Sequence, residues 1–343
     1  MWIGFLDQAT TFAATIEYAI SEDAGRTWGQ PAAVAIPAGL GILNDPAPAV
    51  DSAGNFTLAA LAFELPGQRP HSGIFVYPLP KGATAFGAPV AVDTLNQSSQ
   101  LFYFDKPQIA VTSSGLLATY SLIGAGGTSG TVSRAGIAAT SANGIAWQHD
   151  TIATNAPGSI AICPPGQSVM VVYRGAGGGL WTVSSTDGGL TWNVPVQIAD
   201  ATTTASFPDC VGRGNDTWVS YGVGQTLLGL LHSADGGAHF SPVPITIIGS
   251  VTVAQIGLRD DGSVDIAFYN SSPSVPFGFV HALLLPNSST LGTPELIRGG
   301  LQIPTARQVQ NGLVDFVGVI PSGIVFTDNS SGTSHIAFFR EAK

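Results

Sequence analysis

Charged side chains are scarce in this chain of 343 residues, so the few at prominent places are the first candidates for chemistry. Asp, Glu, Lys and Arg together make up only 10% of the residues. Four carboxylates lie at the border of an apolar stretch, and they are Asp45, Asp105, Asp209 and Glu64. Two carboxylates held near each other can act as general acid and as general base or nucleophile. We therefore take these four as candidate catalytic groups.

Other polar side chains accompany these carboxylates and could hold a polar substrate. Glu64 begins the string "ELPGQRPH", and the remaining candidates are Arg69, His71, Tyr173, Arg174, Tyr221 and Tyr269. Lys106, Arg134, Asp315 and Asp328 are further polar residues at comparable places. A structural alternative stands beside each prediction, because an Asp before a strand can cap a turn. The three tyrosines end similar apolar stretches, so they could equally be repeated packing residues.

The elements that must position these residues repeat along the chain. "SEDAGRTW" (21–28) returns as "STDGGLTW" (185–192) and, less well preserved, as "SADGGAHF" (233–240). Asp can accept backbone hydrogen bonds, Gly permits a positive φ, and the aromatic residue can cover the turn, so each copy predicts a tight turn between strands. A damaged copy, "SANGIAW", begins at Ser141.

Six units between these turns share one pattern of strand, Gly-containing turn and second strand. They begin at Asp45, Asp105, Ser159, Pro208, Val253 and Val314. A step of about 45 to 60 residues with four strands in each unit is typical of propeller blades. No stretch has the apolar spacing of an amphipathic helix, and 43 glycines favour short strands and turns.

The S-x-D-x-G-x-T-W turn resembles the Asp-box, or BNR repeat, of the sialidase-like β-propellers, and the resemblance covers essentially the whole chain. It implies an all-β, six-bladed β-propeller of four-stranded antiparallel blades. Residues 1–343 would form one domain, with residues 1–36 and 314–343 contributing to the closing blade. The strings "MWIGFLD" and "HIAFFREAK" each read as one strand more than this blade needs, so a seven-bladed propeller is the alternative.

Strand direction divides the connections of each blade between two faces. Successive strands run antiparallel, so the first-to-second turns and the box turns share the back face. The second-to-third loops and the beginnings of the first strands share the front face. All the candidate residues named above fall on the front, where sialidase-like enzymes keep their sites and where large propellers bind ligands.

Two functions are open for such a front face. The first is a glycoside hydrolase acting on a glycan through front-face carboxylates at the channel mouth. The second is a non-catalytic propeller that binds a carbohydrate or a protein. Sialidase activity itself is disfavoured, because the Arg-Ile-Pro motif is absent, "GLQIPTAR" has Gln302 in its place, and no arginine triad can be identified. No cofactor is predicted, although inward Asp oxygens could hold a cation in the channel.

Composition limits the partners. The net charge of −10 argues against nucleic acid, whose phosphates need a basic face. No apolar run suits a membrane span, and we expect a monomer that binds a glycan or another small polar ligand. Low Lys content favours a secreted protein whose leader is absent from this sequence, with a cytoplasmic location as the alternative.

The two cysteines fall in the first strands of adjacent units. Aligning "MVVY" (170–173) with "WVSY" (218–221) places Cys163 opposite Val211, one position after Cys210. Successive strand residues point to opposite faces, so this offset lets the two thiols face each other. A disulfide between blades and two unpaired buried thiols both remain open.

Overall fold

A computed structural model describes residues 2–7, 15–64, 71–96, 102–124, 134–154, 160–163, 168–175, 178–200, 205–223, 227–245, 250–272, 275–301, 318–320, 323–328 and 335–339. Within these ranges the regular elements are β-strands, and no helix occurs. The chain divides into two compact units, which are described separately: Met1–Gly177 with Trp181–Val196, and Gly178–Leu180 with Gln197–Lys343.

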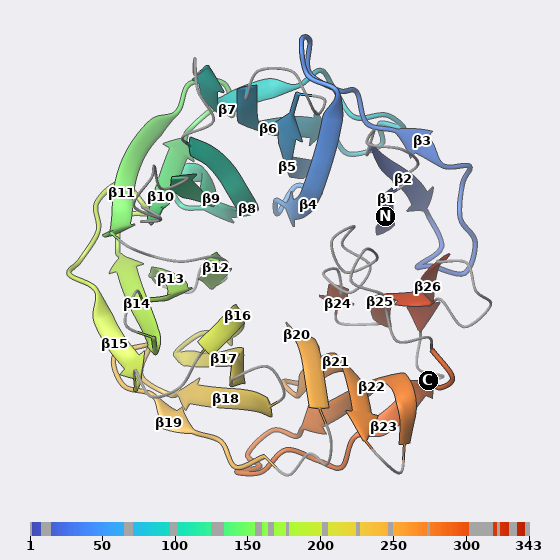
Figure 1. Ribbon diagram of the computed structural model, residues 1–343, viewed down its shortest axis with the longest axis vertical. Coiled ribbons are helices and arrows are strands. Elements are labelled where there is room, and N and C mark those ends of the chain that lie inside the picture. The colour runs from blue at the N-terminus through green and yellow to red at the C-terminus, as the bar shows by residue number, and fades with distance from the viewer. Residues whose placement is uncertain are drawn as a thin grey trace, which may run out of the picture. The chain divides into compact units, whose positions relative to one another are not determined.

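Five sheets have four strands each, hydrogen-bonded in chain order. In the first unit they are β4 (Ile42–Val50), β5 (Phe56–Phe63), β6 (His71–Leu79) and β7 (Val90–Asn96), then β8 (Phe102–Thr112), β9 (Gly115–Gly124), β10 (Arg134–Ser141) and β11 (Gln148–Thr154). The next sheet comprises β12 (Ile160–Cys163), β13 (Val169–Arg174), β14 (Leu180–Ser185) and β15 (Val196–Ala199). The second unit has β16 (Ala205–Arg213), β17 (Asp216–Val223), β18 (Leu227–Ser233) and β19 (Ser241–Pro242), then β20 (Ser250–Leu258), β21 (Val264–Ser272), β22 (Val275–Leu284) and β23 (Glu295–Arg298). Figure 1 labels these strands.

A three-stranded sheet lies toward each end of the chain. One comprises β1 (Trp2–Asp7), β2 (Ile16–Ser21) and β3 (Ala32–Ala33), and the other comprises β24 (Gly318–Ile320), β25 (Gly323–Asp328) and β26 (His335–Phe339). The predicted fold class is confirmed: an all-β, six-bladed propeller of antiparallel blades, when these two sheets are counted together as the closing blade. When these two sheets are counted separately, the described residues form seven sheets, which matches the number of blades in the seven-bladed alternative. A closing blade shared by the chain ends stays a prediction.

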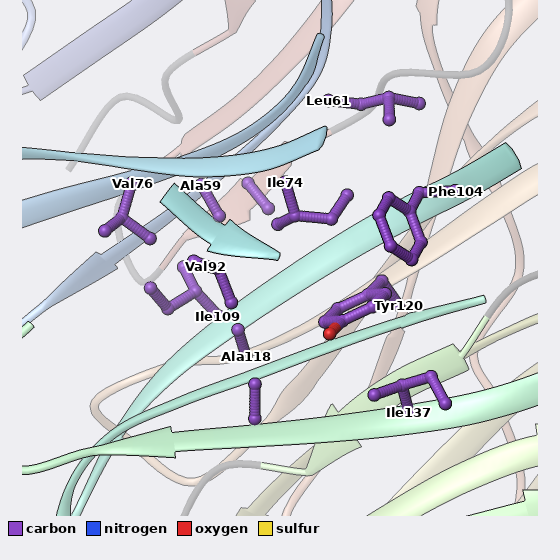
Figure 2. Packing of buried hydrophobic residues seen from close by; sticks show 12 residues of the cluster. Ala59, Leu61, Ile74, Val76, Val92, Phe104, Ile109, Ala118, Tyr120 and Ile137 are labelled. Carbon is purple, nitrogen blue, oxygen red and sulfur yellow. The ribbon is translucent and has the colours of Figure 1, made fainter. Parts of the chain in front are cut away.

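Both faces of the sheet β4–β7 are apolar because a strand of another sheet packs against each of them. Leu58 and Ala60 of β5 pack with Tyr18 of β2. Ala59 and Leu61, which alternate with them along the strand, pack with Phe104 of β8. Figure 2 shows the second of these clusters, where the Phe104 and Tyr120 rings meet edge to face at 5.1 Å. A strand buried on both sides reads as a continuous apolar run, which explains why "FTLAALAF" lacks polar alternation.

The three repeated turns share one hydrogen-bond pattern. Gly25, Gly189 and Gly237 donate their backbone N–H groups to the Oγ of Ser21, Ser185 and Ser233 at 2.7, 2.8 and 2.9 Å. Each Asp in turn accepts the backbone N–H of the residue four positions later, at 2.8 to 2.9 Å. The sequence prediction of tight turns at these places is therefore correct.

These turns lie at the back edge of their sheets, as predicted. The carbonyl of Gly188 accepts hydrogen bonds from Thr112 and Ser114, at the turn between β8 and β9. The aromatic position behaves less uniformly than predicted. Trp192 is partly buried against the core cluster that contains Leu117, whereas Trp28 is 36% exposed.

Replacing Asp187 with alanine is expected to lower the melting temperature without altering ligand preference. Hydrogen bonds from Thr191 lower the pKa of Asp187 to about 2, so its stabilising effect is present above pH 4 and is lost as the pH falls toward 2. Thermal melts of wild type and variant should therefore differ at neutral pH and converge at acid pH. Trp192→Ala, which empties a partly buried site, should cost about 1–4 kcal/mol. Unchanged melting temperatures would contradict the structural role.

Both cysteines are disulfide-bonded, and neither is free. The predicted register is also correct, since Cys163 pairs with Met170 while Val211 pairs with Trp218. Of the two possibilities left open by the sequence, the disulfide is the one confirmed.

Candidate functional site

The first strands of four sheets carry a β-bulge of one extra residue toward the front edge, where each first strand begins. The register shifts between Asn44 and Ala47 in β4, between Asp105 and Gln108 in β8, and between Ser206 and Asp209 in β16. A similar shift occurs in β20. Bulges are frequent beside binding and catalytic sites because they redirect side chains.

Three of these bulges contain a strained residue followed by proline. Asp45, Lys106 and Phe207 have φ angles of 51°, 51° and 46°, and the next residue is Pro46, Pro107 or Pro208. A left-handed conformation is unfavourable for residues with a side chain and persists only where the surroundings impose it. Such strain at repeated positions marks the front edge as the candidate site.

The predicted position of the aspartates needs correction. Asp45, Asp105 and Asp209 lie inside their first strands, which begin earlier, at Ile42, Phe102 and Ala205. They also occupy different places in the four-residue bulge: Asp105 is first, Asp45 second and Asp209 fourth. The strand's alternation therefore aims their side chains in different directions, so they do not form a repeated set.

Asp45 is buried and lies near a cation from the neighbouring sheet. Its Oδ2 is 3.7 Å from Nζ of Lys106, which occupies the equivalent bulge position in β8. Asp105, the residue before Lys106, is half-buried. The structure thus brings Asp45 and Lys106 together as an ion pair.

Asp209 is held by backbone rather than presented for catalysis. Its Oδ2 accepts the N–H of Ile256, in β20, at 2.9 Å. Burial raises the pKa of Asp209 to about 6, against the lowering effect of that hydrogen bond and of the Cys210 N–H. A carboxylate capped by backbone N–H groups favours the structural alternative.

Replacing Asp209 with asparagine should stabilise the protein more at pH 8 than at pH 4. The pKa of Asp209 is higher in the folded protein than its ordinary value of 3.8 in the unfolded chain. The protonated form therefore stabilises the fold fully below pH 3.8, and this stabilisation is lost as the pH rises through about 6. Asparagine keeps the acceptor for Ile256 but cannot ionise. The expected gain at pH 8 is about 2–3 kcal/mol in the free energy of unfolding. Denaturant titrations at both pH values, with exposed Asp260→Asn as control, test this, and equal gains at both would contradict it.

Glu64 and His71 face each other across the connection between β5 and β6. His71 Nδ1 lies 2.7 Å from Glu64 Oε1, and the Glu64 N–H donates to the His71 carbonyl at 3.1 Å. The Glu64 side chain is only 12% exposed, and its Oε2 is buried without a hydrogen-bond partner among the described residues. The imidazole is 35% exposed. The structure therefore pairs a predicted catalytic residue with a predicted substrate-binding one.

The three candidate tyrosines are buried in the core. Tyr173 and Tyr221 are 5% and 7% exposed, and burial raises the pKa of both phenols. Tyr269 is 1% exposed and is stacked on Phe277. Little of their surface is open to a ligand, so the packing alternative fits them better than substrate binding.

The remaining candidates give less information. Arg174 is half-buried, and its Nε has no hydrogen-bond partner among the described residues. Arg69 and Asp315 lie outside the described residues, and only the backbone is described at Arg134 and Asp328.

Sequence reasoning missed two features. Tyr103, at the front end of β8, is 41% exposed, which is unusual for an aromatic residue in this chain. Asp265 and His281 are each 2% exposed, with Arg259 Nε 3.2 Å from Asp265 Oδ2 and His281 Nδ1 3.1 Å from Oδ1. The sequence could have indicated Asp265 and His281, because an acid stands in the apolar string "VDIAFYN" and a histidine stands in the apolar string "FVHALL".

The described residues contain no group of three or more His, Cys, Asp or Glu side chains arranged to hold a metal ion. Nor does that part of the chain include a helix long and apolar enough to cross a membrane. At the front edges of β4–β7 and β8–β11 lie two polar pairs, Asp45–Lys106 and Glu64–His71, and one exposed aromatic ring, Tyr103. This arrangement is suited to holding a polar ligand.

Comparison with solved structures finds proteins of similar fold. No protein-family model matches the sequence, and no curated protein sequence does. The BP39L lectin from Burkholderia pseudomallei is similar in structure, with a TM-score of 0.63 and 16% identity over 99% of this chain and 92% of the lectin. An ulvan lyase of polysaccharide lyase family PL25 gives 0.55 and 11%, over 87% of this chain and 82% of the lyase.

The Trypanosoma rangeli sialidase gives a TM-score of 0.53 and 14% identity, over 81% of this chain and 52% of the sialidase. This chain thus spans about half the length of that enzyme. At such identities the likeness concerns the fold, and the chain has the fold of the sialidase-like β-propellers, as the repeated turns predict.

Proposed function

We propose that this protein is a glycan-binding propeller that holds its ligand at the front edges of the sheets β4–β7 and β8–β11. Similar structures include a lectin, a sialidase and a polysaccharide lyase, which supports a glycan as the ligand. The lectin matches nearly the full length of the chain, which favours binding over cleavage.

One observation carries the preference for binding: candidate catalytic carboxylates are already engaged. Asp45 faces Lys106, Glu64 holds His71, and Asp209 accepts the Ile256 N–H. A hydrolase needs two carboxyl groups about 5–10 Å apart across an open site, one of them able to donate a proton. Charged pairs beside an exposed aromatic ring instead suit the hydroxyl groups and apolar ring faces of a sugar.

The repeated turns with their shared hydrogen bonds are proposed to be Asp-boxes, with a purely structural role. We also propose that the protein is exported. A disulfide persists in oxidising compartments, and the bonded cysteines support that location.

A glycoside hydrolase is the second candidate. It is favoured by Asp209, because a carboxyl group with a pKa near 6 can donate a proton at neutral pH. A screen of chromogenic glycosides decides between the two functions. The binding proposal predicts no release of the chromophore by wild type. Activity in wild type that is lost in Asp45→Asn or Asp209→Asn, without a fall in melting temperature, would contradict it.

A further inference from the structure

The Glu64–His71 pair has a defined polarity. A carboxylate oxygen accepts hydrogen bonds, so the imidazole nitrogen 2.7 Å from Glu64 Oε1 carries the hydrogen. Nδ1–H of His71 therefore donates to Glu64, and Nε2 of the neutral ring is left as an acceptor. No described residue hydrogen-bonds Nε2, and the ring is 35% exposed at the front edge.

The surroundings of His71 disfavour an acidic ligand. β6 packs against β5, β7 and β8, whose titratable groups are Glu64 directly after β5, Asp93 on β7, and Tyr103, Asp105 and Lys106 on β8. Asp93 accepts a hydrogen bond from Tyr120 Oη at 2.7 Å, and Lys106 lies by Asp45. Among these described groups acids outnumber the single cation, and the chain as a whole carries a net charge of −10. A carboxylate or sulfate on the ligand would meet repulsion here.

We propose that His71 is the specificity-determining residue of the glycan site and that its Nε2 accepts a hydrogen bond from a hydroxyl group of an uncharged sugar. Glu64 is the positioning residue, because it fixes the tautomer and the orientation of the ring. The inference rests on the proposed glycan-binding function and narrows it to sugars without a carboxylate or sulfate group. This separates the protein's ligand from sialic acid and from uronic acids.

Protonation should switch this contact off. An imidazolium ring has hydrogens on both nitrogens and cannot accept from a hydroxyl group, and histidine ordinarily changes charge between pH 5 and 8. Binding of an uncharged sugar should therefore weaken as the pH falls through that range. A ligand bound through its carboxylate would show the opposite trend.

The test is an array carrying galactose, fucose, mannose and N-acetylglucosamine beside N-acetylneuraminic and glucuronic acid, probed at about pH 8 and about pH 5.5. Wild type should bind an uncharged sugar, with affinity falling about tenfold at the lower pH, the equivalent of one hydrogen bond. His71→Gln should remove the pH dependence. Glu64→Gln should weaken binding of the uncharged sugar at about pH 8, because a side-chain amide can donate to Nδ1 as well as accept from it and so no longer fixes the tautomer.

His232→Gln is the matched control, since His232 also contacts a carboxylate, Asp216, at 2.9 Å and its side chain is 33% exposed. It should leave both affinity and pH profile unchanged. Preferential binding of the acidic sugars, or a pH profile unchanged in His71→Gln at unchanged melting temperature, would overturn the inference while leaving glycan binding intact. Absence of binding to every sugar would overturn the proposed function as well.

Discussion

A chain lacking residues 1–36 is expected to aggregate and to lose cooperative unfolding. Ile16, Tyr18 and Val34 cover one face of the sheet β4–β7, where they pack against Leu43 and Tyr77. Their removal exposes that apolar face to water and leaves a large patch open to self-association. Size-exclusion chromatography and thermal unfolding followed by circular dichroism measure the effect.

The control for this deletion is a full-length chain with an exposed substitution, Glu22→Ala, in the turn after β2. It should remain soluble and unfold like wild type. A soluble deletion variant with a single sharp unfolding transition would contradict the packing described for β2 and β3.

Replacing Asp265 with alanine is expected to lower the free energy of unfolding by about 3–5 kcal/mol. Asp265 is almost fully buried and contacts both Arg259 and His281, and Glu295 Oε2 lies 3.8 Å from the other nitrogen of His281. Removing the carboxylate leaves a guanidinium group without its buried partner, which is a larger penalty than the loss of one exposed ion pair. Denaturant titration at pH 7 measures it.

Asp261→Ala is the comparison for this variant, because Asp261 lies in the adjacent turn and accepts hydrogen bonds from the backbone N–H and the hydroxyl group of Ser263 at 2.9 and 2.6 Å. Its effect should be clearly smaller. Equal effects of the two substitutions would show that the Arg259–Asp265–His281 network is not a significant source of stability.

The fold was predictable because its signals are local and repeated. The turns at Ser21, Ser185 and Ser233 need only residues within eight positions of one another. The strand pairs then follow from short apolar runs on either side of a glycine turn. The number of blades was harder to predict, because the sequences of β1 and β26 have an ordinary strand pattern that does not indicate which sheet each strand joins.

The candidate site was only partly predictable. The sequence identified Glu64, His71 and Asp45 as front-edge residues, but pairing depends on contacts between strands that are distant in sequence. The Asp45–Lys106 ion pair arises from equivalent bulges in two sheets. Burial of Tyr269 depends on Phe277 in the next strand. The bulges themselves were missed, although a proline after Asp45, Lys106 and Phe207 was their common signal.

Glycan-array binding of wild type, Tyr103→Ala and Ile145→Ala tests directly whether the ligand binds at the front edge. Tyr103 is exposed at the front end of β8, and Ile145, which is 69% exposed, lies in the turn after β10 at the opposite edge of the same sheet. We expect wild type and Ile145→Ala to bind the same sugar, and Tyr103→Ala to lose most of this binding at an unchanged melting temperature. Binding that survives in Tyr103→Ala but is lost in Ile145→Ala would contradict a front-edge site.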